Sequence, residues 1–180
     1  ATALDTNNDN NPEERDEICA DLPYIIHDKT GPVVSAQQTD GSYNVTYTVT
    51  VRNLGGAAGD YDLTDTPDFD DDITINNTSS YTSNAPGHPA NPGSVSLLTV
   101  SGATNTLASD QLIAAPVSPA VEVVHTYILN YNVSLNLGAA SADAGNNIYT
   151  ACGSTIPGQI KPGEGLYNAT TLDLNDDNKH

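Results

Sequence analysis

The stretch Tyr43-Asn44-Val45-Thr46-Tyr47-Thr48-Val49-Thr50-Val51 decides the fold, because Tyr and Val alternate in it without a fault with Asn and Thr. A period of two is the pattern of a β-strand with one face in a core and the other in solvent. Asp40-Gly41 before the stretch is a hairpin signal, and Asn53-Leu54-Gly55-Gly56 after it marks a second turn. The stretch therefore predicts a strand bounded by turns at both ends.

The rest of the chain repeats this pattern. Residues 123–137 form a second long alternating segment, and helical spacing is absent throughout. Pro and Gly break up 85–93 and 153–165, which predicts loops there. Shorter strands are predicted at 23–30, 33–37, 60–66, 73–76, 95–100, 147–152 and 165–174. Many short strands with regular turn signals predict an all-β fold, an immunoglobulin-like antiparallel β-sandwich.

The sequence at the beginning of the chain recurs near its end. Ala1-Thr2-Ala3-Leu4-Asp5-Thr6-Asn7-Asn8-Asp9-Asn10 recurs as Ala169-Thr170-Thr171-Leu172-Asp173-Leu174-Asn175-Asp176-Asp177-Asn178, with seven of ten positions identical at an offset of 168 residues. A fixed offset is typical of tandem arrays. We therefore expect residues 1–18 to be the tail of a preceding repeat with an acidic linker, 19–174 the sandwich repeat, and 175–180 the start of the next linker.

Composition excludes several classes of function. The formal net charge is −18, from 23 acidic and 5 basic residues, which speaks against nucleic acid as a partner because phosphate binding needs clustered Lys and Arg. No apolar run approaches the roughly 20 residues that span a bilayer. Neither a Gly-x-Ser-x-Gly elbow nor a Gly-rich phosphate loop after a strand is present, so we do not expect an enzyme.

Several motifs, in order and spacing, resemble a known family. They are Lys29-Thr30, Asp40-Gly41-Ser42-Tyr43-Asn44-Val45-Thr46-Tyr47, Val51-Arg52-Asn53-Leu54-Gly55, Asp62-Leu63-Thr64-Asp65-Thr66-Pro67 and Gly165-Leu166-Tyr167-Asn168-Ala169-Thr170. Over roughly 22–174 the chain resembles the conserved repeat domain of bacterial surface proteins, domain of unknown function eleven. It departs from a common form of the pattern at Thr66-Pro67, where a Leu often intervenes. The resemblance implies an immunoglobulin-like sandwich repeated in long secreted or wall-anchored proteins, and hence an extracellular place on the bacterial surface.

Some related adhesin and pilin domains carry an internal Lys–Asn isopeptide bond, and the resemblance points here to Lys29 and Asn168 with Asp65 as the assisting acid/base. Burial favours the neutral amine as nucleophile and a protonated carboxyl as hydrogen-bond donor to the amide. Strand parity places Asp65 and Asn168 on the apolar faces of their strands, whereas the orientation of Lys29 stays open. The alternative is that Lys29 reaches solvent, Asp65 caps a turn and Asn168 bonds locally.

Oxygen ligands recur at both ends of the chain with the spacing of a calcium loop. The candidate ligands are Asp5, Asn7, Asp9, Asn11, Glu13 and Asp16 at one end and Asp173, Asn175 and Asp177 at the other. Calcium would make the junction between repeats rigid, whereas the alternative is a flexible acidic linker. A second acidic run, Asp68 with Asp70, Asp71 and Asp72, can hold a cation, although a solvated loop is the favoured interpretation.

The two cysteines, Cys19 and Cys152, permit one disulfide. In a sandwich whose first and last strands run side by side in parallel, both cysteines fall at the same end of the domain, so we expect them to pair. The alternative is pairing with a cysteine of a neighbouring repeat.

The expected function is that of a structural spacer repeat in a large bacterial adhesin or filament, with neighbouring repeats of the same chain as partners. The alternative is a ligand-binding adhesin module that recognises carbohydrate or protein through loops 68–93 or 138–164.

Overall fold

A computed structural model describes residues 2–4, 14–16, 18–118, 121–137, 148–153 and 159–174, with side chains from residue 18 onward. Within these ranges the chain forms strands and connecting loops and no helix. No helix in the described part therefore has the length and apolar character needed to cross a membrane.

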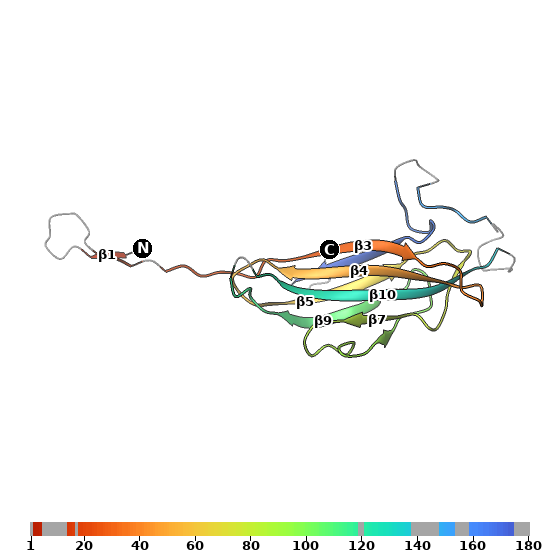
Figure 1. Cartoon of the computed structure of the whole chain (residues 1–180). Coiled ribbons are helices and arrows are strands. Elements are labelled where there is room, and N and C mark those ends of the chain that lie inside the picture. Colours follow the sequence, from red (N-terminus) through yellow and green to blue (C-terminus); the bar gives the residue numbers. More distant parts are fainter. Residues whose placement is uncertain are drawn as a thin grey trace.

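The strands follow one another as β1 (Thr2–Leu4), β2 (Glu14–Asp16), β3 (Ile25–Val34), β4 (Tyr43–Asn53), β5 (Gly59–Pro67), β6 (Ile73–Ile75), β7 (Ser80–Ser83), β8 (Val95–Ser96), β9 (Asn105–Ile113), β10 (Val123–Leu135) and β11 (Asn168–Asp173). Figure 1 shows the long strands β3, β4 and β10 side by side, with β1 apart from the sheets.

Two antiparallel sheets build the sandwich. One has the strand order β3-β4-β10-β7-β8, with β6 also paired to β10, and the other has the order β11-β5-β9. The β1–β2 pair is separate from both sheets. Every strand pairing among the described residues is antiparallel, as expected of a fold built from hairpins and returning strands. The prediction of an all-β sandwich is confirmed, whereas its immunoglobulin-like character stays a prediction.

The core follows from the alternation in β4. Val45, Tyr47, Val49 and Val51 are buried, and the Thr residues between them remain partly accessible on the other face. They pack in one cluster with buried residues of the facing sheet, among them Leu63. Burying apolar area is the main favourable term in folding, and a fully buried Val or Leu contributes about 1.5–3 kcal/mol.

The strand predictions differ from the structure in several places: among them, β1 and β2 were not expected, and the predicted strand 95–100 is only Val95–Ser96. β7 and β9 were not expected either. In β9 the buried positions do not alternate, and its pairing with β5 shifts register twice. The predicted strands 23–30 and 33–37 are largely one strand, β3, whose pairing with β4 is interrupted by an irregularity between Thr30 and Val33. Residues 148–152 of the predicted strand 147–152 form no strand.

The first and last strands of the sandwich, β3 and β11, run in opposite directions. β3 begins opposite Asn53 of β4, and Ile25 there packs against Gly59, where β5 begins. β11 instead begins opposite Pro67, the last residue of β5. The expectation of parallel first and last strands is therefore wrong, because β11 enters the fold at the end where β3 leaves it.

Candidate functional site

Asp65 lies at the centre of the candidate site and brings together the two residues expected to crosslink. Its side chain is fully buried on β5. The Lys29 Nζ atom donates to Asp65 Oδ1 at 2.6 Å, and the Asn168 Nδ2 atom donates to Asp65 Oδ2 at 3.1 Å. Residues 36 and 103 positions away from Asp65 in sequence thus meet at one carboxyl group.

Two further donors complete the surroundings of this carboxyl group. Tyr131 of β10 donates its hydroxyl to Asp65 Oδ2 at 2.5 Å, and the Thr170 hydroxyl of β11 donates to Asp65 Oδ1 at 3.2 Å. A buried carboxyl group is costly unless it is hydrogen-bonded, and four donors satisfy Asp65 here. The site therefore draws on both sheets, with Lys29 and Tyr131 from one and Asp65 and β11 from the other.

The strands position these side chains through the pleat of the sheet. On β5 the residues Tyr61, Leu63 and Asp65 share the buried face, as parity predicts. The structure also resolves the open orientation of Lys29, which lies on the inward face with a side chain only 15% exposed. Two residues later, Gly31 has a φ of +113°, and a Cβ there would lie 2.8 Å from the Thr46 carbonyl oxygen, so the strand irregularity beside Lys29 requires glycine.

The surroundings of Lys29 shift the pKa of its amine downward. Burial lowers the pKa of Lys29, and this effect outweighs the attraction of Asp65, which acts in the opposite direction. The Lys29 Nζ atom lies 5.1 Å from the centroid of the Tyr47 ring. Burial also raises the pKa values of Tyr47 and Tyr131, so both phenols stay protonated and act as hydrogen-bond donors.

One atom of the Asn168 carboxamide is buried without a hydrogen bond. Its Oδ1 atom is buried and has no hydrogen-bond partner among the described residues, although Nδ2 is bonded to Asp65. Rotating the amide by half a turn would bring Oδ1 to the Asp65 carboxyl group. A cavity of about 430 Å³ adjoins the group and is lined by Lys29, Tyr47, Cys152 and Asn168 among others.

This arrangement holds what amide exchange requires. It has a shielded amine whose pKa is lowered, a carboxamide on the same carboxyl group, and a buried acid/base between them. Sequence reasoning missed Tyr131 and Thr170. The signal for Tyr131 was available, because Tyr127, Leu129 and Tyr131 alternate on the buried face of β10.

The expected Cys19–Cys152 disulfide is not present, and both residues are exposed free thiols. Cys19 precedes β3, and the Tyr24 carbonyl accepts a bond from Leu54 N at the turn after β4. The Cys152 Sγ atom instead bonds the Glu164 carbonyl at 3.3 Å, ahead of the start of β11. Because β3 and β11 run in opposite directions, the two thiols belong to opposite ends of the sandwich, and the pairing expected from parallel strands is wrong.

Most of the expected calcium ligands fall outside the described residues, namely Asp5, Asn7, Asp9, Asn11, Glu13, Asn175 and Asp177. Asp16 lies at the end of β2, and Asp173 ends β11 with 9% of its surface exposed. Because β1 pairs with β2 in antiparallel register, residues 5–13 connect two paired strands.

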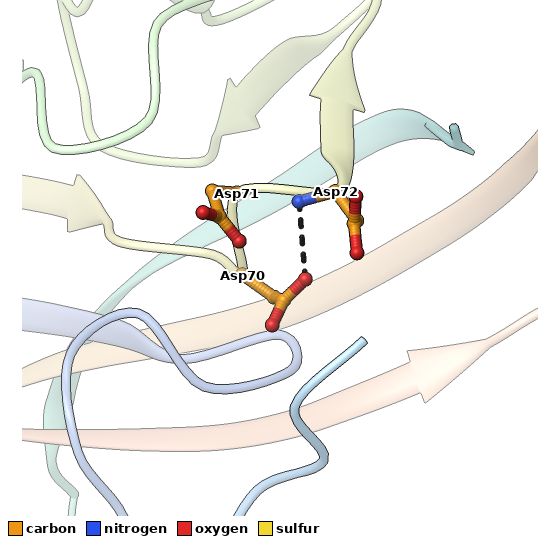
Figure 2. A group of neighbouring side chains, drawn as sticks. All are labelled: Asp70, Asp71 and Asp72. Carbon is orange, nitrogen blue, oxygen red and sulfur yellow. Dashed lines mark hydrogen bonds between the residues drawn. The ribbon is translucent and has the colours of Figure 1, made fainter. Parts of the chain in front are cut away.

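The second acidic run is not a solvated loop, contrary to the favoured interpretation. Asp70 and Asp72 are each 1% exposed, Asp68 is half-buried, and Asp71 is exposed to solvent. Figure 2 shows the three carboxylates around the start of β6, with Asp70 Oδ1 accepting a bond from Asp72 N at 3.1 Å. Its Oδ2 atom accepts from Thr150 N at 2.8 Å, so Asp70 fixes the segment 148–153 to this loop.

Three comparisons, with protein-family models, with curated proteins and with solved structures, found no match to this chain.

Proposed function

We propose that this chain is a structural spacer repeat of a large extracellular bacterial surface protein, an adhesin or a filament, and that an autocatalytic isopeptide bond between Lys29 and Asn168 locks its sandwich. The observation that carries the proposal is the meeting of both side chains on the buried carboxyl group of Asp65. Burying an amine, a carboxamide and a carboxyl group together costs folding free energy. A spacer domain that performs no reaction would have no use for such an arrangement.

The reaction balances without a cofactor. The neutral Lys29 Nζ attacks the Asn168 Cγ while a protonated Asp65 polarises the amide oxygen. The Cγ–Nδ2 bond then breaks, and a proton from Lys29 passes through Asp65 to the departing nitrogen. One ammonia leaves, a secondary amide joins the two side chains, and Asp65 is regenerated.

The crosslink would suit a mechanical role. Lys29 lies on β3 of one sheet and Asn168 on β11 of the other, so the bond would join the two sheets near the last strand. Tension along the chain would then pass through covalent bonds, whereas separate ladders can be unzipped bond by bond. The repeated sequence at the two ends of the chain and the net charge of −18 fit a solvated array whose neighbours are copies of itself.

Intact-mass spectrometry tests the crosslink. We expect the purified chain to weigh less than its sequence by the mass of one ammonia, and Lys29→Ala, Asn168→Ala and Asp65→Ala each to restore the full mass of their sequences. Lys161→Ala is the matched control, because Lys161 lies in the turn before Glu164 and not at Asp65; it should keep the deficit. A full mass in the unaltered chain would overturn the crosslink.

We further propose that calcium binds the acidic segments at the junctions between repeats. The pairing of β1 with β2 supports this, because it draws together the two ends of the segment that carries Asp5, Asn7, Asp9, Asn11 and Glu13. A hard cation takes six to eight oxygen ligands, which such a loop supplies.

A second candidate is a ligand-binding adhesin module. It is favoured by a cavity of about 490 Å³ between the loop Pro86–Pro89 and the residues Thr106–Leu112 of β9. A glycan array probed with the purified chain tests this function, and specific binding that is lost on altering the 86–89 loop would favour it over the spacer.

A further inference from the structure

One edge of the smaller sheet has no paired strand in the described part of the chain, although β3 of the larger sheet lies beside it. β11 pairs with β5 on one side and has no strand on the other side among the described residues. The Asp68 amide donates to the Tyr167 carbonyl, and Pro67 opposite Asn168 has no N–H to donate. Hydrogen-bonded and non-bonded pairs alternate along an antiparallel ladder. The backbone groups of Thr170 and Leu172 therefore point away from β5, toward the open edge.

The other end of the chain contains a copy of that edge strand with a partner. By the offset of 168 residues, Thr2–Leu4 corresponds to Thr170–Leu172. In this structure Thr2–Leu4 is β1, and it pairs in antiparallel register with β2, Glu14–Asp16, with Ala3 opposite Arg15. A strand has two edges, so the pairing with β5 and the pairing with a β2 segment are compatible.

We propose that the segment Glu14–Asp16 of one copy adds as a strand to the open edge of β11 in the preceding copy, extending that sheet to the order β2-β11-β5-β9 across the junction. The inference rests on the tandem array of the proposed function. Its register follows from β1 and β2: Thr170 faces Asp16, Thr171 faces Arg15, and Leu172 faces Glu14 of the following copy.

The unpaired edge of β11 suits an added strand. An open edge is a template for pairing with another strand, and added strands bind through main-chain hydrogen bonds. In the single copy the His27 Nε2 atom lies 3.3 Å from the Thr170 carbonyl oxygen, so His27 has to turn aside before the added strand can use that acceptor. The junction would then be a continuous sheet, which is stiffer than a linker.

A two-copy chain tests the proposal, made by joining residues 1–174 directly to residues 7–180. In a background with Cys19→Ser and Cys152→Ser, Thr171→Cys in the first copy is combined with Arg15→Cys in the second. In the proposed pairing these positions would form a non-hydrogen-bonded pair, whose short Cα separation suits a disulfide. We expect mild oxidation of a dilute sample to join them, as found by peptide mass spectrometry.

The matched control combines Thr171→Cys with Glu14→Cys, which the pleat places on the opposite face. Equal crosslinking of both pairs, or none in either, would overturn the proposal. Hydrogen exchange gives a second measurement without substitutions. The Thr170 and Leu172 amides of the first copy should exchange at least about tenfold more slowly than those of the second, and equal rates would contradict the pairing. The ammonia deficit in the same sample reports the isopeptide bond independently, so either idea can fail alone.

Discussion

The Tyr61 hydroxyl and the His125 Nδ1 atom lie 2.8 Å apart in the core and join β5 of one sheet to β10 of the other. The same hydroxyl lies 2.7 Å from the Tyr127 hydroxyl, and His88 packs edge-on to the Tyr127 ring with centroids 5.5 Å apart. This polar cluster is buried in the core between the two sheets, so its hydrogen bonds and its protonation state bear directly on stability.

The first prediction concerns pH. Burial, with a smaller contribution from His88, lowers the pKa of His125 below its ordinary 6.5. The unfolded chain takes up a proton at His125 near pH 6.5, whereas the folded chain resists it, so the stabilisation is present above that pH and is lost as the pH falls. We expect the free energy of unfolding to fall between pH 7 and 5 by at most about 1.4 kcal/mol per pH unit from this group.

Urea unfolding at several pH values measures this slope. The variant His125→Gln should be less stable at pH 7 but should lose less stability on acidification, because it has no proton to take up. His27→Gln is the matched control, since His27 lies on the edge strand β3 and is only partly buried. An unchanged slope in His125→Gln would show that other groups cause the acid sensitivity.

The second prediction separates two tyrosines at the candidate site. Tyr131 donates to Asp65, whereas Tyr47 donates to the Leu166 carbonyl and makes no hydrogen bond to the carboxyl group. Both Tyr131→Phe and Tyr47→Phe leave a buried acceptor short of a donor, at a cost of about 1–3 kcal/mol each. Only Tyr131→Phe should also slow the loss of ammonia, because it alters the acid/base.

Chains are recovered in the uncrosslinked form, unfolded in urea and refolded. Mass spectrometry then follows the rate of crosslinking. Equal rates in the two variants would mean that Tyr131 supports the fold and not the reaction. Comparing both with the unaltered chain removes effects of refolding itself.

The sequence predicted the parts of the fold that follow a simple period. The alternation in 43–51 and 123–137 gave β4 and β10, which lie next to each other in the larger sheet. β9 was not predicted, because Leu107 and Ala108 are consecutive buried residues and Asp110 has a φ of +48°. Together they break the alternation at a bulge. Such irregularities depend on the partner strand, so the sequence of a single segment does not predict them.

The candidate site was predictable to a similar degree. Parity placed Asp65 on a buried face, and the resemblance supplied Lys29 and Asn168 as partners. Parity said nothing of strand direction, which depends on connections through the whole domain, and the cysteine pairing failed for that reason. Burial of Asp70 and Asp72 was equally hidden, because a run of acids is solvated unless loops distant in sequence, here 148–153, fold over it.

The third prediction concerns the thiols. Because Cys19 and Cys152 are exposed and belong to opposite ends of the sandwich, both should react with a maleimide reagent in the native, unreduced chain. We expect two labels per chain, and one label in each of Cys19→Ser and Cys152→Ser. Labelling that appears only after reduction would indicate a disulfide and contradict the strand directions described above.

The fourth prediction concerns calcium at the junction. Titration calorimetry should show binding with a dissociation constant of about 10⁻⁴–10⁻³ M, the range typical of extracellular modules. The double variant Asp5→Asn, Asp9→Asn should abolish the heat, because it removes two charged ligands from the connection between β1 and β2.

A control that removes the same number of negative charges elsewhere distinguishes a specific calcium site from general attraction of calcium to an acidic protein. Asp28→Asn with Asp60→Asn alters two exposed carboxylates on β3 and β5, and should leave the binding heat unchanged. Nonspecific attraction by the net charge of −18 would instead weaken equally in both double variants and would vanish in added salt. Because a bound ion would hold residues 5–13 between the paired strands, calcium should also slow their cleavage by protease, and an unchanged cleavage rate would leave the junction a flexible linker.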